Sequence, residues 1–296
     1  MEIKKMVLNH IKQLSLNIGL AATLLAGCSA ARHDDHSHHH AHGGTAEFLA
    51  HAAVMVESGP VKILFDPIFD KDYGRFQLVA QETQAKLMAG QTPFDGVDAV
   101  FVSHAHGDHF AAEMMIDYLN ANPKVTLIAP EQALEKLRET ESWDEALSPR
   151  IHAKPLALNT SSDETFDLGG SAVDVTRLRL PHVGGERQAK VENIVYRVSL
   201  SSDATIMHLG DTDPDETGLR AQSPVFKAVS SDMAFVPVWF IGAADEATTK
   251  ALLNAEHVIG VHVPKEVPEA VKASGVDYFF VPGERRTLKT SDDKND

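Results

Sequence analysis

A short apolar run, Val97–Val102, leads directly into a loop that carries three histidines and an aspartate. A run of this length and composition predicts a buried strand, whose rigid end holds the loop side chains in place. The side chains concerned are His104, His106, Asp108 and His109. Packed histidines and carboxylates are costly without partners, and a divalent metal ion is the partner that suits them. The chain is therefore expected to adopt a fold that gathers ligands at strand ends.

The residues around this loop favour ligand chemistry. His104 and His106 are two residues apart, so both can point to one side of an extended segment. Gly107 permits a turn that other residues make only with strain. We predict a helix from about Asp108 to Leu119, whose N-terminus keeps Asp108 ionised and disfavours protonated His109. Carboxylate and neutral imidazole are the states that bind zinc-type ions.

The remaining pattern predicts an α/β domain. Strands are expected at 46–57, 61–65, 97–102, 125–129, 172–180, 193–200, 205–209, 234–238 and 258–263, and further helices at 131–141 and 244–253. The first two strands are joined through Ser58-Gly59-Pro60, which is typical of a hairpin turn. Antiparallel strands come first and strands then alternate with helices, which indicates two sheets with helices outside them in one domain.

The pattern His104-x-His106-x-Asp108-His109 after a buried strand resembles the signature of the metallo-β-lactamase superfamily. The segments Phe48–Val54 and Ile63–Pro67 resemble the opening strands of one branch of it. That branch includes ascorbate-phosphate lactonase-like and N-acylphosphatidylethanolamine phospholipase D-like proteins; Ala50 stands where they usually have Gly. The resemblance covers nearly all of residues 46–282 and implies a four-layer αββα sandwich, formed here by a hydrolase domain at 46–286.

The resemblance also implies a site for two divalent metal ions. It assigns His104, His106 and His182 to one ion; Asp108, His109 and His262 to the other; and Asp211 to a bridging position. His182, Asp211 and His262 each come at an apolar run, where a strand would end. Asp108 is the expected catalytic residue, which orients the nucleophile. Zinc is the leading ion by ligand type, and manganese or iron also suits such ligands.

Several other side chains compete for roles at this site. Asp213 is a rival to Asp211, and His257 is a rival to His262. His208 is expected to pack or to support a ligand. His51 is expected to be a packed core residue or a contact of a ligand or substrate. Asp66 and Trp239 are further candidates for such a contact, and core packing is the alternative for Trp239.

The N-terminal segment predicts export. Lys4, Lys5 and Lys12 precede an apolar stretch that ends in Leu25-Ala26-Gly27-Cys28. This resembles the bacterial lipoprotein signal, which implies removal of residues 1–27, acylation of Cys28 and attachment to the cell envelope. The alternative is an ordinary signal peptide with an incidental cysteine.

A histidine-rich segment follows. Residues 28–45 hold six histidines between positions 33 and 42, without apolar periodicity, and predict a disordered tether. These histidines either bind metal or belong to a solvated linker. A flexible tail is predicted at 287–296.

Composition narrows the function. The net charge of −15 disfavours nucleic-acid binding, and the single cysteine excludes an intramolecular disulfide. We expect a hydrolase acting on an ester, phosphodiester, lactone or amide in a small or lipid-derived molecule. The alternative is a metal-delivery lipoprotein with a non-catalytic domain. A redox role is disfavoured because His106 stands where related diiron oxidoreductases have a glutamate.

Overall fold

The structure is a computed structural model that describes residues 44–200 and 204–288. The predicted signal peptide, Cys28, nearly all of the histidine-rich segment and residues 289–296 lie outside the described residues. Within the described part, no helix has both the length and the apolar character needed to span a bilayer.

Seven strands form the first sheet, in the order β13-β1-β2-β3-β4-β5-β6. Their bounds are β1 (Thr45–Ala50), β2 (Ala53–Ser58), β3 (Val61–Phe65), β4 (Ala99–Phe101), β5 (Thr126–Ala129), β6 (Ile151–Ala153) and β13 (Arg285–Thr287). β2 pairs antiparallel with both β1 and β3, so those two strands run in the same direction. β3 to β6 are parallel to one another.

Six strands form the second sheet, in the order β12-β11-β10-β9-β8-β7. Their bounds are β7 (Ser161–Leu168), β8 (Ser171–Leu180), β9 (Asn193–Ser199), β10 (Thr205–His208), β11 (Ser231–Pro237) and β12 (Ala255–Val261). β9 pairs antiparallel with β8 and β10, and β10 to β12 are parallel. β8 therefore runs in the same direction as β10, β11 and β12.

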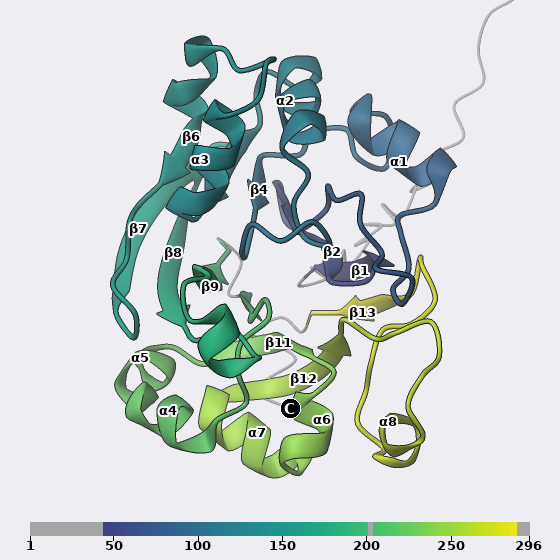
Figure 1. Ribbon diagram of the computed structural model, residues 1–296, viewed down its shortest axis with the longest axis vertical. Coiled ribbons are helices and arrows are strands. Elements are labelled where there is room, and N and C mark those ends of the chain that lie inside the picture. The colour runs from purple at the N-terminus through teal and green to yellow at the C-terminus, as the bar shows by residue number, and fades with distance from the viewer. Residues whose placement is uncertain (1–43, 201–203, 289–296) are drawn as a thin grey trace, which may run out of the picture. The chain divides into compact units, whose positions relative to one another are not determined.

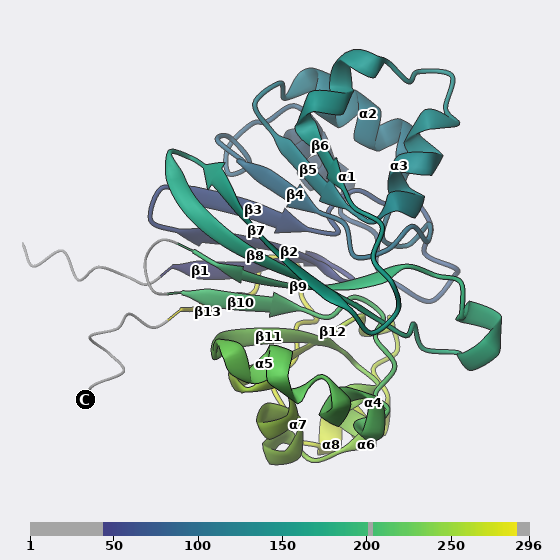
Figure 2. The same cartoon turned by 90° about the vertical axis from the view of Figure 1, so that its left-hand side faces the viewer.

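Helices cover the outer face of each sheet (Figures 1 and 2). The helices are α1 (Gln81–Met88), α2 (Ala112–Ala121), α3 (Glu131–Arg138), α4 (Glu216–Ala221), α5 (Ser223–Ala228), α6 (Phe240–Ala243), α7 (Glu246–Leu253) and α8 (Glu269–Ala273). One apolar cluster joins α1, α2 and α3 to the first sheet, and another joins α4, α5 and α7 to the second. Short 3₁₀ turns lie at Glu145–Arg150 and Gly185–Gln188.

The main core lies between the two sheets. Strand side chains alternate between faces: Ile63 and Phe65 of β3 enter the cluster between the sheets, whereas Leu64 enters the cluster beneath the helices. Across the core, the Tyr196 hydroxyl of β9 donates a 2.9 Å hydrogen bond to the carbonyl of Val102, just beyond β4. These layers confirm the predicted αββα sandwich in a single domain.

Three predicted elements need correction. The strand expected at 46–57 is interrupted at His51 and Ala52, where the chain turns and forms β1 and β2. The helix expected from Asp108 begins only at Ala112, because the amides of His109 and Phe110 both bond to the carbonyl of His106 in a tight turn. The strand expected at 258–263 is not the last, because β13 follows and pairs with β1.

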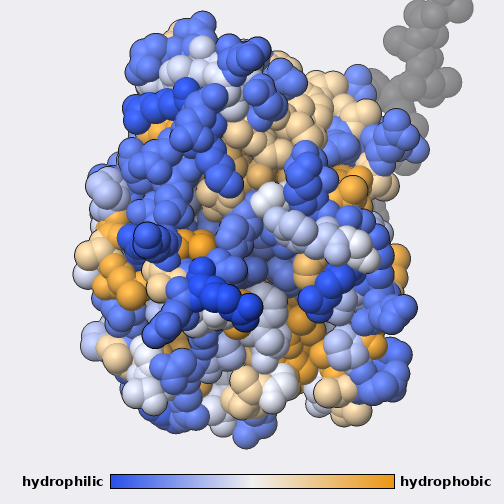
Figure 3. All heavy atoms as spheres, viewed as in Figure 1, coloured by the Kyte–Doolittle hydropathy of each residue, from blue (hydrophilic) through white to orange (hydrophobic). Residues whose placement is uncertain are grey.

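The strand directions bring many carboxyl ends to one edge. β1, β3 and β4 of the first sheet and β8, β10, β11 and β12 of the second are each followed at that end by a residue singled out from the sequence. The space-filling view shows hydrophilic residues gathered in the middle of the face seen in Figure 1 (Figure 3). This edge is where the candidate site lies.

Candidate metal centre

The loop after β4 carries four of the predicted ligands. The amides of Asp70 and Lys71 donate to the carbonyl of Gly107, at 3.3 and 3.1 Å, and Lys136 of α3 donates to the carbonyl of Ala105. Gly107 is not in the left-handed region that we expected. A Cβ there would lie 2.6 Å from Cγ of Lys71, so the glycine is required by a close approach.

His104, His106 and His182 form the first ligand group. Their ring centroids lie 4.7 to 4.8 Å apart, and one ligand atom from each falls within 4.8 Å of the others. His182 follows β8, and its segment pairs with Thr212 across an isolated β-bridge. His104 is fully buried and His106 is half-buried, so this group is the more open side of the site.

Asp211 lies between the two ligand groups. Its Oδ2 atom is 3.4 Å from Nε2 of His182 and 3.4 Å from Nε2 of His262, and its Oδ1 is 3.2 Å from Nε2 of His109. The turn after β10 requires Gly210, which has a φ of +54° and whose added Cβ would lie 2.6 Å from Cβ of Ser103. A carboxylate at this position can contact ions on both sides.

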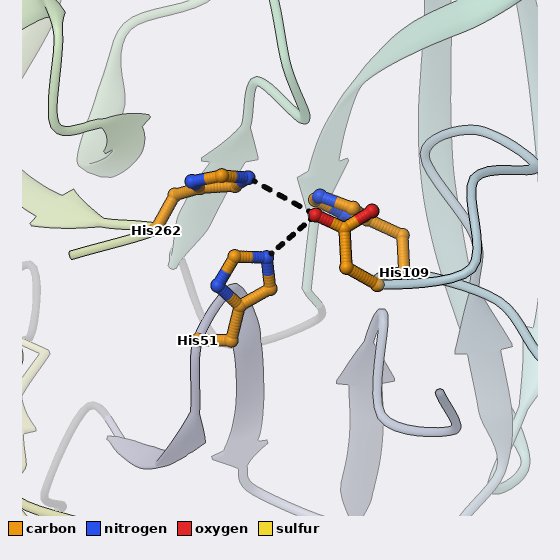
Figure 4. Close-up of side chains that lie close together, drawn as sticks. His51, His109 and His262 are labelled. Carbon is orange, nitrogen blue, oxygen red and sulfur yellow. Dashed lines mark ion pairs between the residues drawn. The ribbon is translucent and has the colours of Figure 1, made fainter. Parts of the chain in front are cut away.

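Asp108, His109 and His262 form the second ligand group, and His51 joins them. Nε2 of His262 and Nε2 of His51 lie 3.6 and 3.3 Å from the same Asp108 oxygen, Oδ2 (Figure 4). One ligand atom from each of the four residues lies within 4.8 Å of the others. The structure thus brings all seven predicted ligands together, along with a histidine for which the sequence had left several roles open.

Most ligand histidines are held by an oxygen at Nδ1. Nδ1 of His104 lies 3.0 Å from Ser103 Oγ, and Nδ1 of His182 lies 2.6 Å from the carbonyl of Val183. Nδ1 of His109 lies 2.7 Å from Asp66 Oδ2. Such partners fix the tautomer and direct Nε2 inward, as in known metal sites. Asp66 therefore holds His109, a predicted ligand, and such a supporting contact was one of the roles predicted for Asp66.

The electrostatics of the cluster favour cation binding. Burial lowers the pKa of His104 well below its ordinary value, which keeps the imidazole neutral. Burial alone would raise the pKa of Asp211, but His262 and His109 outweigh it and hold that pKa well below its ordinary value. Burial also opposes the charged form of Asp108, yet His262 and His51 hold its pKa low. Two carboxylates thus stay ionised inside the protein.

His109 departs from the prediction that its proton is disfavoured. Burial lowers its pKa, but the carboxylates of Asp211 and Asp66 outweigh burial and raise the pKa well above its ordinary value. The helix N-terminus invoked for this effect begins only at Ala112. A metal ion at Nε2 would take the place of that proton, since metal binding releases protons from ligands.

The buried nitrogen atoms fit a metal ion. Nε2 of His51, His104, His109, His182 and His262 is buried and forms no hydrogen bond with any described residue. Buried nitrogen atoms that form no hydrogen bond are costly in free energy. A metal ion bound to these nitrogens and to the two ionised carboxylates would remove that cost. Each group combines imidazole nitrogens with a carboxylate oxygen. This is a zinc-type set of ligands, and manganese and iron also accept it.

The other singled-out residues have separate places. His208 is buried, with Nε2 donating to the carbonyl of Ala52 (3.0 Å) and its ring stacked on Phe65, so it packs and supports the turn of His51. Trp239 is half-buried, donates from Nε1 to the carbonyl of Thr212 (2.8 Å) and lies against His262. The rival His257 is exposed on β12.

Asp213, the rival acid, accepts from the amide of Asp215 in an exposed turn. The sequence reasoning missed Asn193, whose Oδ1 accepts from the amide of Asp211 (2.8 Å) and whose Nδ2 donates to Thr212 Oγ1 (2.9 Å). It also missed Phe76, whose ring lies 4.3 Å from that of His51. A lone polar residue opening the apolar run of β9 was the only sequence signal for Asn193.

Comparisons with known proteins agree with this architecture. Over 257 residues the chain is 24% identical to a UPF0173 metal-dependent hydrolase of Pyrococcus furiosus, covering 81% of this chain and 98% of the relative. Igni18, a metallo hydrolase of the archaeon Ignicoccus hospitalis, is similar in structure with a TM-score of 0.55 and 17% identity, covering 84% of this chain and 99% of that one.

A protein of Veillonella parvula named a possible metal-dependent hydrolase gives a TM-score of 0.56 at 15% identity, covering 84% of this chain and 100% of that one. At these identities the structural likeness shows the fold alone. The family described as the Beta-lactamase superfamily domain matches residues 61–279, a segment that contains all seven predicted ligands and most of the chain. The chain therefore belongs to the beta-lactamase superfamily domain family.

Proposed function

We propose that the protein is a hydrolase that uses two divalent metal ions, zinc being favoured by the ligand types. The observation that carries this proposal is the position of Asp211, with one oxygen 3.4 Å from both His182 and His262, ligands of separate groups. His104, His106 and His182 would hold one ion and Asp108, His109 and His262 the other. The hydrolase names of the relatives support the same reaction class.

Two bound ions would supply a water whose pKa falls from 15.7 to about 7, together with polarisation of the oxygen under attack. The position of the attacking nucleophile would then depend on a residue of the chain itself. Asp108 is fixed by His51 and His262 through one oxygen, Oδ2. Because its pKa is held low, Asp108 stays ionised and can orient the nucleophile by accepting a hydrogen bond from it.

The rim favours a substrate with an apolar part. Phe76 and Trp239 lie against His262, with ring centroids 4.4 and 4.8 Å away. The buried Phe76 would exclude water from one side of the site, and the half-buried Trp239 would offer a surface for an acyl or aromatic group. An ester, lactone, amide or phosphodiester with such a group is the proposed substrate class, in line with the branch that includes lactonase-like and phospholipase D-like proteins.

The test compares full-length protein as purified, after chelation, and after addition of zinc, manganese or iron. Each form is assayed with p-nitrophenyl acetate, bis(p-nitrophenyl) phosphate, an aromatic lactone and a chromogenic β-lactam. We expect turnover of at least one substrate that disappears on chelation and returns with metal. Ion binding without turnover of any substrate would instead favour the metal-delivery role.

The sequence also supports a proposed location at the bacterial cell envelope. Acylation at Cys28 would tether the domain to the periplasmic side of a bacterial envelope membrane, near lipid-derived substrates. Growth with labelled palmitate tests this directly. The wild type should carry label and partition with membranes, and Cys28→Ser should lose both properties.

A further inference from the structure

His51 lies in a strained turn at the carboxyl end of β1. Its φ of +54° is in the left-handed region, where a non-glycine residue is uncommon and persists only when the surroundings enforce it. The carbonyl of His51 accepts a 2.8 Å hydrogen bond from the amide of His262, which itself has a φ of +61°. Two strained histidines are thus locked together, and an outlier of this kind points to a function for the side chain.

The His51 ring has the features of a ligand. The residue is 1% exposed, and neither ring nitrogen forms a hydrogen bond with a described residue. Its Nε2 lies 3.3 Å from Oδ2 of Asp108, and Figure 4 shows the rings of His51, His262 and His109 close together. A buried imidazole whose nitrogens form no hydrogen bond is costly, and a metal ion at Nε2 would remove that cost.

Packing alone does not account for this residue. Phe69 and Phe76 flank the ring at 5.7 and 4.3 Å, an environment in which an apolar side chain would pack without leaving ring nitrogens unpaired.

We propose that His51 is a further metal ligand, binding a divalent cation through Nε2 together with Asp108, His109 and His262. This inference rests on the proposed two-ion function. The second group would then offer three imidazoles and Asp108 in addition to Asp211, whereas the first group offers three imidazoles and Asp211. The two sites are therefore unequal: the His51 site is richer in protein ligands, and the half-buried His106 site keeps room for water and substrate.

The test uses a pair of variants of similar reach. His51→Gln keeps an N–H that can donate to Asp108 but binds metal poorly, whereas His51→Glu keeps a ligating oxygen. The exposed His257→Gln is the control. Zinc and cobalt are titrated into each chelated full-length protein, ions per chain are counted, and the visible spectrum of the cobalt form is recorded.

We expect His51→Gln to lose affinity for one of two ions by about 100-fold or more and to change the cobalt spectrum. His51→Glu and His257→Gln should each retain two ions. Two ions bound by His51→Gln with wild-type affinity and spectrum would overturn the inference while leaving the proposed function standing. A wild type that binds fewer than two ions would overturn the proposed function itself.

A readout on the wild type guards against misfolding of a variant. Each histidine bound through Nε2 to cobalt shows one strongly shifted Nδ1–H resonance in the proton NMR spectrum. The di-cobalt protein should show one such resonance more than the predicted ligands His104, His106, His109, His182 and His262 supply. Resonances from those five alone would contradict ligation by His51.

Discussion

Oδ2 of Asp66 lies 2.7 Å from Nδ1 of His109, and both side chains are buried. The same carboxylate accepts from the amide and hydroxyl of Ser103, at 2.7 and 2.6 Å. Asp66 follows β3, and Ser103 and His109 follow β4, so residues at the ends of neighbouring parallel strands hold the His109 ring at Nδ1. The rigid sheet thus determines where Nε2 of His109 points.

Asp66→Asn should weaken metal binding at the second group. The amide cannot provide the same charged acceptor to His109, and loss of such a partner typically costs about 10- to 100-fold in metal affinity. Zinc titration of the chelated protein measures this directly. Asp98→Asn, a half-buried carboxylate that bonds to the Lys62 amide on the same sheet, is the matched control. Equal affinity in both variants would contradict the role given to Asp66.

Asp211→Asn should abolish tight binding of the ion pair. The Asp211 carboxylate lies 3.4 Å from one histidine of each group, and an amide oxygen lacks its charge. We expect fewer than two ions per chain by elemental analysis and a loss of turnover of about 100-fold or more. Asp213→Asn, two residues along the same loop, should behave as the wild type. The reverse ranking would mean that Asp213 is the ligand.

Tyr196→Phe should destabilise the domain without changing the number of bound ions. It leaves the buried carbonyl of Val102 without this donor, which costs about 1–3 kcal/mol. Urea unfolding of the metal-free protein measures the difference in free energy of unfolding. Tyr278→Phe, at a half-buried position, controls for the loss of a hydroxyl. Equal losses in the free energy of unfolding would show that the hydrogen bond from Tyr196 to Val102 does not add measurably to stability.

Because of the buried His208, the free energy of unfolding should decrease in acid. Its Nε2 donates to Ala52 and its Nδ1 accepts from the amide of Gly210, so both nitrogens are used in the neutral form. Burial lowers its pKa below the ordinary 6.5. The unfolded chain therefore takes up a proton that the folded protein resists, and the free energy of unfolding falls as the pH decreases below about 6.5.

The contribution of His208 is isolated by comparing variants. His208→Gln should lose less stability than the wild type over that pH range, by up to about 1.4 kcal/mol per pH unit. His257→Gln, at an exposed position, should follow the wild-type curve. A His208→Gln curve parallel to the wild type would contradict the lowered pKa.

Local pattern was enough to predict the layers and the loop of His104, His106, Asp108 and His109, because an apolar strand and the polar loop after it are consecutive in the sequence. His182, Asp211 and His262 were implied by the resemblance to the metallo-β-lactamase superfamily, and the structure brings them into the same cluster. The turn at His51 was not predictable, since Ala46–Glu57 reads as one strand and the break depends on the distant amide of His262. β13 was missed for a similar reason. Its sequence, Arg285-Arg286-Thr287, has no apolar pattern, and the strand forms because β1 offers an edge to pair with.

The start of the helix is not readable from the sequence, because the apolar side chains from Phe110 onward keep helical spacing although the helix begins only at Ala112. A tight turn around the His106 carbonyl and a 2.9 Å bond from the Ala111 amide to the Ile68 carbonyl delay the helix. Asn193 shows the same limit. Its bonds to Asp211 and Thr212 join segments from different strands, and only the folded sheet brings them together.

The most direct test of the two-ion account is to titrate chelated full-length protein with zinc while following bound ions and substrate turnover together. The account predicts that two ions bind per chain and that turnover reaches its maximum only as the second ion binds. Full turnover by protein that holds no metal ion would contradict it.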